Sequence, residues 1–403
     1  MANIAVLGYG TVGSGVVEVV QMNKEKLAGC ANEEINVKYV LDLRDFPQDP
    51  VEKILVHDFE TILNDDDVDI VVEVLGGVKF AYPYVKSALL KGKSVATSNK
   101  ELVAKYGAEL LAIAKEKNVN FFFEASVGGG IPIIRPINEC LTADEITEIT
   151  GILNGTTNYI LTKMSKEGLD FGTVLKDAQD KGYAERNPEA DVEGYDACRK
   201  IAILSSLVFG KQVDFEDIYT EGITSITPGD IKLAQSLGYS IKLLASSRCV
   251  DGNVYAMVAP NMVGADCPLY NVEDVFNAIM AVGNAVGEVM FYGKGAGKLP
   301  TASAVVADVV AAVKNKGRHI EVKWDSDKLK LSDISSSEKR FFVRIADTEE
   351  SRVEAEKAFG VEEFIRVEDV KGECAFITEV MSEEQFALKE KTLKGIRNRI
   401  RIR

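Results

Sequence analysis

Histidine is almost absent from this chain, which carries only His57 and His319 among its 403 residues. If the protein is an enzyme, its proton transfers would therefore fall to Lys, Asp or Glu. The six cysteines are scattered, without a C-x-x-C pair and without histidines grouped beside them. This pattern argues against a zinc site or a disulfide framework and favours a reducing cytoplasm.

Positive charge is also scarce, since 47 Lys and Arg stand against 62 Asp and Glu and the net charge is −15. A protein that binds nucleic acid carries clustered basic residues in excess, so nucleic acid is not an expected partner. No apolar run approaches the ~20 residues that span a bilayer, and the N-terminus enters a strand pattern directly, without the features of a secretory signal. The hydrophobic content of 46% is enough for two or three packed domains.

The first third of the chain alternates short apolar strands with helical patterns. Strands are predicted at residues 3–8, 37–43, 69–75, 94–97 and 120–124, and helices at 12–27, 82–90 and 101–117. Such alternation produces βαβ crossovers, so residues 1–132 are expected to form a doubly wound parallel sheet of the Rossmann type. A helix of small residues at 301–315 is expected to pack back onto this domain.

The pattern changes after this domain. Residues 133–300 indicate an α+β domain, and residues 316–337 are polar and charged, as expected of a linker with a strand or two. In residues 338–403, strands are predicted at 341–346, 364–370, 374–380 and 398–402, and helices at 351–359 and 383–393. This βαββαβ order is typical of a small ferredoxin-like domain.

A glycine-rich segment, Gly-Tyr-Gly-Thr-Val-Gly, follows the first predicted strand and matches G-x-G-x-x-G. Gly8 permits a tight turn, Gly10 lets the backbone approach a pyrophosphate, and Gly13 lets helix and strand pack closely. The N-terminus of the following helix attracts the phosphates. Between a strand and a helix the motif predicts dinucleotide binding, and the alternative is a turn with only a packing role.

The residue that selects between NAD and NADP is expected at the end of the second strand. Asp42 could accept the ribose 2′-hydroxyl of NAD, whereas Arg44 could pair with the 2′-phosphate of NADP. The sequence contains both, so the preference stays open with Arg44 slightly favoured. Each residue could equally be a solvated loop charge.

Three further segments carry polar groups that suit a site. Thr97 to Lys100 follow a strand on the side of the ligand crevice, where Lys100 could touch substrate or nicotinamide or could simply be a surface lysine. Glu124 precedes Gly128-Gly129-Gly130, a combination that could supply oxygens to a hard cation or serve as a hinge between domains. Residues 151–159 are rich in Gly, Thr and Asn, which suits a small polar substrate or a polar turn before a helix.

A fourth segment contains an Asp and a Lys four residues apart. Asp196 and Lys200 share one face of a predicted helix whose next residues are apolar. A buried Asp–Lys pair can hold the lysine and tune its acidity for acid–base catalysis, although an ordinary stabilising ion pair is the alternative. A second glycine-rich loop at 292–301 could approach the cofactor or could only link the domains.

The order of these motifs resembles homoserine dehydrogenase of the three-part bacterial type, from residue 1 to about residue 313. The strongest segments are TSNKE (97–101), EASVGGGIPII (124–134), GILNGTTNYI (151–160), ADVEGYDACRK (190–200) and GAGKLPTASAVVAD (295–308). This family reduces L-aspartate 4-semialdehyde to L-homoserine with NADPH or NADH, reversibly, in the biosynthesis of threonine, methionine and isoleucine. The resemblance also implies a homodimer or homotetramer that pairs through the middle domain.

The resemblance further implies residue roles. Lys200, positioned with Asp196, would donate the proton to the nascent alkoxide, and Lys100 would lie beside substrate and nicotinamide as a second candidate for the proton path. The implied substrate-binding residues are Glu185 and Asp191 for the ammonium, with Gly155, Thr156 and Tyr183 lining the pocket. The implied cofactor-facing residues are Gly10, Thr11, Val12, Thr97, Ser98, Gly182 and Gly297. The implied ligands of a monovalent cation, sodium or potassium, are the Glu124 side chain and the carbonyls of Val127, Gly129 and Ile131.

The C-terminal domain resembles the ACT type, with which some family members sense threonine. The loop at 346–351 reads Ala-Asp-Thr-Glu-Glu-Ser and lacks the Pro-Gly that usually opens the ligand loop, so a threonine effector is doubtful and an oligomerisation module is the alternative. Two rival functions remain for the whole chain. A phosphorylating semialdehyde dehydrogenase would need an activated Cys with a His base, and a nucleotide sensor without catalysis would leave Asp196 and Lys200 unexplained.

Overall fold

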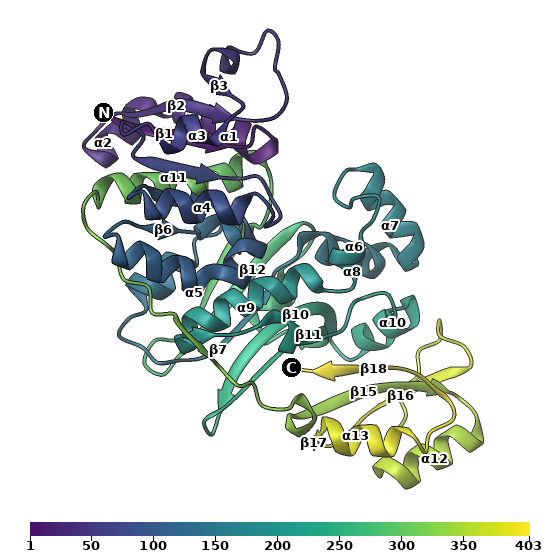
Figure 1. Cartoon of the computed structure of the whole chain (residues 1–403). Coiled ribbons are helices and arrows are strands. Elements are labelled where there is room, and N and C mark those ends of the chain that lie inside the picture. The colour runs from purple at the N-terminus through teal and green to yellow at the C-terminus, as the bar shows by residue number, and fades with distance from the viewer. The chain divides into compact units, whose positions relative to one another are not determined.

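The computed structural model describes all 403 residues and divides them into two compact units (Figure 1). The first unit contains residues 1–145, 202–215 and 291–329. The second unit contains residues 146–201, 216–290 and 330–403. None of the helices has both the length and the apolar character that crossing a membrane requires.

Six parallel strands form the sheet of the first unit, in the order β3-β2-β1-β4-β5-β6. The strands are β1 (Ala2–Leu7), β2 (Ile35–Leu41), β3 (Leu55–Val56), β4 (Ile70–Glu73), β5 (Ser94–Thr97) and β6 (Phe121–Phe122). The order reverses between β1 and β4, which is where a doubly wound sheet opens its ligand crevice. The predicted Rossmann-type sheet is confirmed.

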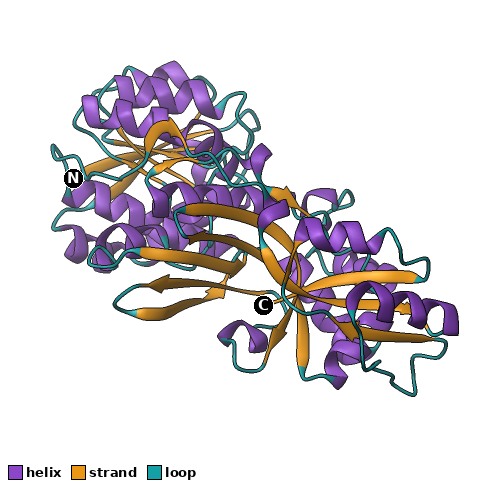
Figure 2. Cartoon of the chain, turned by 90° about the horizontal axis from the view of Figure 1, so that it is seen from below, coloured by secondary structure: helices purple, strands orange, loops and turns teal.

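Helices lie on both faces of this sheet, as Figure 2 shows. They are α1 (Thr11–Met22), α2 (Lys24–Ala31), α3 (Phe59–Leu63), α4 (Ala81–Leu90), α5 (Lys100–Glu116) and α11 (Lys298–Lys314). Helices α1 and α11 approach closely at Gly15, where a Cβ atom would lie only 3.0 Å from the Cβ atom of Ala302. The small residues of α11 therefore let it join the core that covers β1 and β4.

Local predictions for this unit differ from the structure in three places. The helix predicted at 12–27 is divided, because Asn23 has non-helical backbone angles (φ −112°, ψ 23°). The strand predicted at 120–124 ends at Phe122, since Glu124 begins the short helical turn η2 (Glu124–Ser126). Residues 49–63, where no element was predicted, contain η1 (Pro50–Ile54), β3 and α3.

A mixed sheet of ten strands forms the second unit's framework, with the main order β13-β12-β7-β10-β11-β18-β15-β16. Its strands are β7 (Ile146–Ile152), β9 (Tyr219–Thr220), β10 (Tyr239–Val250), β11 (Asn253–Gly264), β12 (Phe276–Gly283), β13 (Gly287–Lys294), β15 (Glu338–Ala346), β16 (Glu373–Ile377), β17 (Met381–Ser382) and β18 (Ile396–Ile402). Besides α11, the α-helices that follow residue 150 are α6 (Gly155–Glu167), α7 (Phe171–Asp180), α8 (Glu189–Val192), α9 (Tyr195–Phe209), α10 (Pro228–Ser236), α12 (Glu349–Phe359) and α13 (Glu383–Glu390). A separate pair of short strands, β8 (Lys211–Gln212) and β14 (Asp325–Lys328), belongs to the first unit. Of the two, β14 lies inside the segment predicted as a linker.

The C-terminal region contains most of its predicted elements, but the strand predicted at 364–370 is wrong. Only Ile365 forms a bridge, to Ala375 on β16, and the chain then turns, with the amide of Val370 donating to the carbonyl of Val367 at 3.0 Å. Strand β18 lies beside β15, as Figure 1 shows in yellow and green, and also pairs in parallel with β11. Residues 338–403 therefore share one sheet with the middle of the chain.

Candidate active site

The glycine-rich turn between β1 and α1 has the backbone geometry that its sequence predicts. Gly8 has φ +100°, a conformation that side chains disfavour, and a Cβ atom at Gly13 would lie 1.9 Å from the carbonyl oxygen of Gly8. A Cβ atom at Gly10, by contrast, would meet nothing within 4 Å. The turn is therefore tightly packed at Gly8 and Gly13 and has free space at Gly10. Helix α1 begins directly after Gly10, with Thr11 and Val12, so its N-terminal amides can face a phosphate there.

The two candidate selectors of the ribose phosphate are paired with each other after β2. Arg44 Nε lies 3.0 Å from Asp42 Oδ1, and Arg44 Nη2 lies 2.9 Å from Asp42 Oδ2. Asp42 Oδ2 also accepts the backbone amide of Tyr9 at 2.8 Å, which ties this pair to the glycine-rich turn. The hydrogen bonds from Arg44 hold the pKa of Asp42 well below its usual range, so Asp42 is a carboxylate.

The segment that carries Lys100 is held by a buried carboxylate. Thr97 Oγ1 donates to Glu73 Oε2 at 2.6 Å and accepts the amide of Asn99 at 2.9 Å. Asn99 then caps α5, with its Oδ1 accepting the amide of Leu102 at 3.1 Å. Lys100 is the first residue of α5, and it follows Ser98 and the capping residue Asn99.

Glu73 is a residue of this corner that sequence reasoning missed. It ends β4, its side chain is fully buried, and burial raises its pKa above the ordinary value of a carboxyl group. The signal was present as a single acidic residue inside the apolar run Ile-Val-Val-Glu-Val-Leu. A carboxyl group at the carboxyl end of a central parallel strand borders the crevice of this fold.

Glu124 is engaged by main-chain donors on both carboxylate oxygens. Its Oε1 accepts the amides of Ile133 at 2.5 Å and Ile134 at 2.7 Å, and its Oε2 accepts the amide of Arg135 at 2.9 Å and the Nε of the same residue at 3.3 Å. Its own amide donates to Asp308 on α11 at 2.9 Å. Four donors therefore occupy the acceptor positions of this carboxylate.

Two further glycine-rich segments of the first unit, residues 128–130 and the loop at 292–301, lie against each other. A Cβ atom at Gly129, which has φ +57°, would lie 2.2 Å from the carbonyl oxygen of Gly295, and the amide of Gly130 donates to the carbonyl of Lys294 at 3.1 Å. Gly297 then precedes α11 with φ +124°. The loop that carries the carbonyls of Val127, Gly129 and Ile131 is thus packed on the second glycine-rich loop.

A polar network in the second unit joins the segment at 151–159 to the segment at 190–200. Asn154 caps α6, with its Oδ1 accepting the amide of Thr157 at 2.9 Å. The Nδ2 of Asn154 lies 2.7 Å from Asp191 Oδ1 and 2.9 Å from Asp196 Oδ2. One amide therefore brings together two carboxylates from α8 and α9.

Lys200 completes this network. Its Nζ lies 2.7 Å from Asp196 Oδ2 and 2.7 Å from the main-chain carbonyl oxygen of Leu153. The side chains of Lys200 and Asp196 are 12% and 8% exposed, so the predicted pair is largely buried. An ammonium group has three N–H donors. Lys200 directs two of them to Asp196 and Leu153, and the third can donate to a substrate oxygen. The arrangement can hold a lysine at a carbonyl group and deliver a proton to it.

Of the other predicted substrate residues, some contact this network and others do not. Thr156 Oγ1 donates to the carbonyl of Tyr183 at 2.7 Å, and a Cβ atom at Gly155 would lie 2.8 Å from the carbonyl oxygen of Val275. Tyr183 is exposed and packs edge-on against Tyr159, with ring centroids 5.0 Å apart. The structure brings Asp191 into the network, whereas Glu185 is exposed, beyond the turn at Gly182.

Comparisons with known proteins show the family to which the chain is similar. A family model described as homoserine dehydrogenase matches residues 132–310, and one described as homoserine dehydrogenase, NAD binding domain, matches residues 8–124. The chain is 46% identical to the homoserine dehydrogenase of Bacillus subtilis over 316 residues, which is 77% of this chain and 73% of that protein.

Solved structures are similar as well. A homoserine dehydrogenase from Thiobacillus denitrificans has a TM-score of 0.90 and 35% identity, with 100% of this chain and 98% of that chain covered. A hyperthermophilic archaeal homoserine dehydrogenase in complex with NADPH has a TM-score of 0.66 and 30% identity, with 77% and 97% covered. The chain therefore belongs to the homoserine dehydrogenase family of NAD(P)-dependent oxidoreductases.

Proposed function

We propose that this protein interconverts L-aspartate 4-semialdehyde and L-homoserine with NADPH or NADH, a step of amino-acid biosynthesis. The observation that carries the proposal is the buried network of Asn154, Asp191, Asp196 and Lys200, which lies in segments that match the family. It offers both a proton donor for a carbonyl oxygen and a carboxylate for an ammonium group.

When bound, the nicotinamide cofactor would supply the hydride for the new C–H bond at the aldehyde carbon, and the electron pair of the C=O bond would remain on oxygen. The ammonium of Lys200 stabilises that negative charge and transfers its proton to the oxygen, which gives the hydroxyl group of the product. Lys200 then regains a proton from water. In the opposite direction neutral Lys200 accepts the hydroxyl proton. Asp196 positions Lys200, and Lys100 is the second candidate for the proton path.

The substrate would be held by its ammonium and by the small residues around it. Asp191 and Glu185 are the proposed carboxylates, and Gly155, Thr156 and Tyr183 are the proposed lining. The proposed cofactor-binding residues are Gly8, Gly10, Thr11, Val12, Gly13, Arg44, Thr97, Ser98, Lys100, Gly182 and Gly297.

Initial rates with homoserine and each nicotinamide cofactor in turn test the proposed reaction. We expect reduction of NADP or NAD that depends on homoserine, and oxidation of NADPH or NADH when the semialdehyde is added. A nucleotide sensor would bind the reduced cofactor without oxidising it. A phosphorylating enzyme would lose activity after thiol alkylation, which we do not expect, because burial raises the pKa of Cys198, the cysteine nearest Lys200 in sequence.

A monovalent cation, sodium or potassium, is the second part of the proposal. Because four donors already occupy Glu124, we assign its side chain the task of holding the loop and assign the cation to the carbonyls of Val127, Gly129 and Ile131. Thermal melting in sodium, potassium and choline chloride at equal ionic strength tests this assignment. A higher melting temperature in sodium or potassium is expected, and equal melting in all three salts would contradict it.

The C-terminal region and the assembly form the third part. Strand order β18-β15-β16, with Ile365 bridged to β16, fits a ferredoxin-like module of the ACT type with a shortened strand. We propose that it serves a homodimer or homotetramer and does not sense threonine, because the loop at 346–351 lacks the Pro-Gly of a ligand loop. Titration of threonine against activity and melting temperature tests this, and a response in either would identify threonine as an effector. The six free thiols fit a cytoplasmic location.

A further inference from the structure

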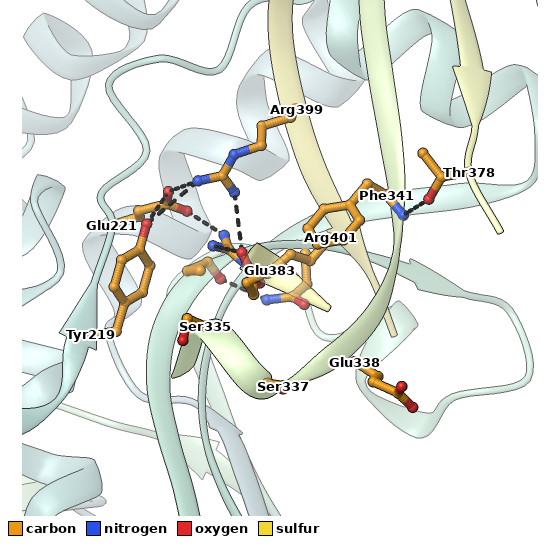
Figure 3. Close-up of polar contacts among 12 residues, drawn as sticks. Tyr219, Glu221, Ser335, Ser337, Glu338, Phe341, Thr378, Glu383, Arg399 and Arg401 are labelled. Atoms are coloured by element: carbon orange, nitrogen blue, oxygen red, sulfur yellow. Dashed lines mark hydrogen bonds and ion pairs between the residues drawn. The ribbon is translucent and has the colours of Figure 1, made fainter. Parts of the chain in front are cut away.

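Arg401, on β18, is a fully buried cation, with 1% of its surface exposed. Its Nε and Nη2 donate to the carboxylate of Glu383 at the start of α13, and its Nη1 donates to Glu221 (Figure 3). One buried guanidinium thus joins the C-terminal helix α13 to the segment that follows β9. Removal of either partner would leave an uncompensated charge in the interior.

Glu221 is held from several directions. Its Oε1 accepts the hydroxyl of Tyr219 at 2.6 Å and the Nη2 of Arg399 at 2.8 Å, and its Oε2 accepts Arg401, as Figure 3 shows. Its main-chain amide donates to the carbonyl of Val258 on β11 at 2.7 Å. Both the side chain and the backbone of Glu221 are therefore anchored, the side chain mainly by β18.

The residues after Glu221 pack directly on the turn between α8 and α9. The amide of Ile223 donates to the carbonyl of Val192 at 2.8 Å. A Cβ atom at Gly222 would lie 2.3 Å from that same carbonyl oxygen, and one at Gly194 would lie 3.2 Å from the Cγ2 of Thr220. Backbone lies against backbone here, so a shift of residues 221–223 would displace the turn.

The two helices that this turn joins carry the carboxylates that Asn154 bridges. Asp191 lies in α8, and Asp196 lies in the first turn of α9, where the carbonyl of Gly194 accepts the amide of Cys198 at 2.9 Å. Asp196 in turn holds Lys200. A continuous chain of contacts therefore runs from β18 to the proposed proton donor.

We propose that the C-terminal strand β18 is a positioning element of the active site. Arg399 and Arg401 hold Glu221, and the Glu221 segment fixes the turn that presents Asp191 and Asp196. This inference rests on the proposed role of the Asp196–Lys200 pair and goes beyond it. It assigns the C-terminal region a positioning role in the reaction, whatever ligand or partner that region also binds.

A second buried ion cluster provides a matched control. Arg344 on β15, 6% exposed, donates to Asp230 on α10 at 2.8 Å and also contacts Glu373. It joins the same C-terminal region to the middle of the chain, but its partner lies on α10 and not in the 221–223 segment. Arg344→Met should therefore loosen the C-terminal region without moving the turn.

The test compares Arg401→Met and Glu221→Gln with Arg344→Met in the full-length chain. For the first two we expect kcat for homoserine to fall about 3- to 30-fold, the range of coupling between packed residues, with the pH profile of kcat displaced and the dissociation constant of the reduced cofactor unchanged. Arg401→Lys should recover part of kcat. Arg344→Met should lower the melting temperature but leave kcat and its pH profile intact.

A parent-like kcat and pH profile in folded Glu221→Gln would overturn the inference. So would equal losses of kcat in Arg344→Met and Arg401→Met, which would show only general loosening of the structure. Glu221→Gln keeps the shape of the side chain but removes its charge and replaces one acceptor oxygen with an amide donor. Because this variant does not depend on Arg401→Met, the test stands even where Arg401→Met fails to fold. Failure of the parent protein to reduce NADP or NAD with homoserine would instead remove the proposed function, and the two failures are thereby distinguishable.

Discussion

The side-chain nitrogen Nδ2 of Asn154 bridges Asp191 and Asp196, at 2.7 Å from Asp191 Oδ1 and 2.9 Å from Asp196 Oδ2. The same side chain caps α6 through its oxygen, which accepts the amide of Thr157. Asn154 therefore holds two carboxylates near each other while it fixes the start of a helix. The amide supplies donors to charges that would otherwise repel each other in a buried place.

Asn154→Ser separates these two tasks. Serine caps helices about as well as asparagine, so any fall in melting temperature should come from the carboxylates that lose a donor and not from the helix end. The bridge to the carboxylates is lost, and a hydrogen bond to a charged group is worth ~1.5–3 kcal/mol, so kcat/KM should fall by roughly 10- to 100-fold. Steady-state kinetics and thermal melting check both expectations. Unchanged kinetics would mean that the bridge does not serve the reaction.

Lys200→Met should lower turnover by ~10²–10⁴-fold, because the developing alkoxide loses its proton donor. The dissociation constant of NADPH, followed by its fluorescence, should stay close to that of the parent. Lys176→Met is a matched control, since Lys176 also pairs with an aspartate four residues away, Asp180 at 3.5 Å, but on the surface. Its turnover should be normal. Normal turnover in Lys200→Met would transfer the proton role to another group.

Arg44→Ala should raise the dissociation constant of NADPH about tenfold, a loss of ~1.4 kcal/mol of binding free energy, and should leave that of NADH nearly unchanged. Arg44 is exposed and already oriented by Asp42, so its guanidinium is available to a 2′-phosphate. Fluorescence titration of both reduced cofactors measures the two constants, with the exposed Lys53→Ala as the control. Weaker binding of NADH with unchanged binding of NADPH would assign the selector role to Asp42.

Asp308→Asn should flatten the pH dependence of stability. Burial raises the pKa of Asp308 from its ordinary value to about 8, although Arg135 Nη2 lies 3.0 Å from its Oδ1. Between pH 4 and pH 8 the folded state then binds a proton that the unfolded state has released, so stability falls as pH rises, by up to ~1.4 kcal/mol per pH unit.

Urea midpoints at pH 5, 7 and 9 measure this dependence in the parent and in Asp308→Asn. The variant should resemble the parent at pH 5, where the acid is neutral like the amide, and should be the more stable protein at pH 9. Parallel curves for the two proteins would contradict a proton on Asp308 in the folded state.

Much of the first unit was predictable because its signals are local. The alternation of strands and helices led to the correct parallel sheet, and the glycine spacing 8, 10 and 13 led to a turn whose backbone excludes side chains at Gly13. Asp196 and Lys200 were predictable as a pair because four residues separate them on one helix. The absence of a strand at 364–370 was not predictable, because a strand needs a pairing partner and only Ile365 forms a bridge.

The sequence by itself determined the elements with local periodicity, the glycine turn and the helical Asp–Lys pair, since these depend on residues a few positions apart. Only the tertiary structure decided that Asn154 meets carboxylates 37 and 42 residues away, that Glu73 is buried beneath Thr97, and that Arg401 reaches Glu221. Those contacts depend on which strands become neighbours and which charges are enclosed together. Strand pairing and burial are properties of the whole packed chain, and no short stretch of residues encodes them.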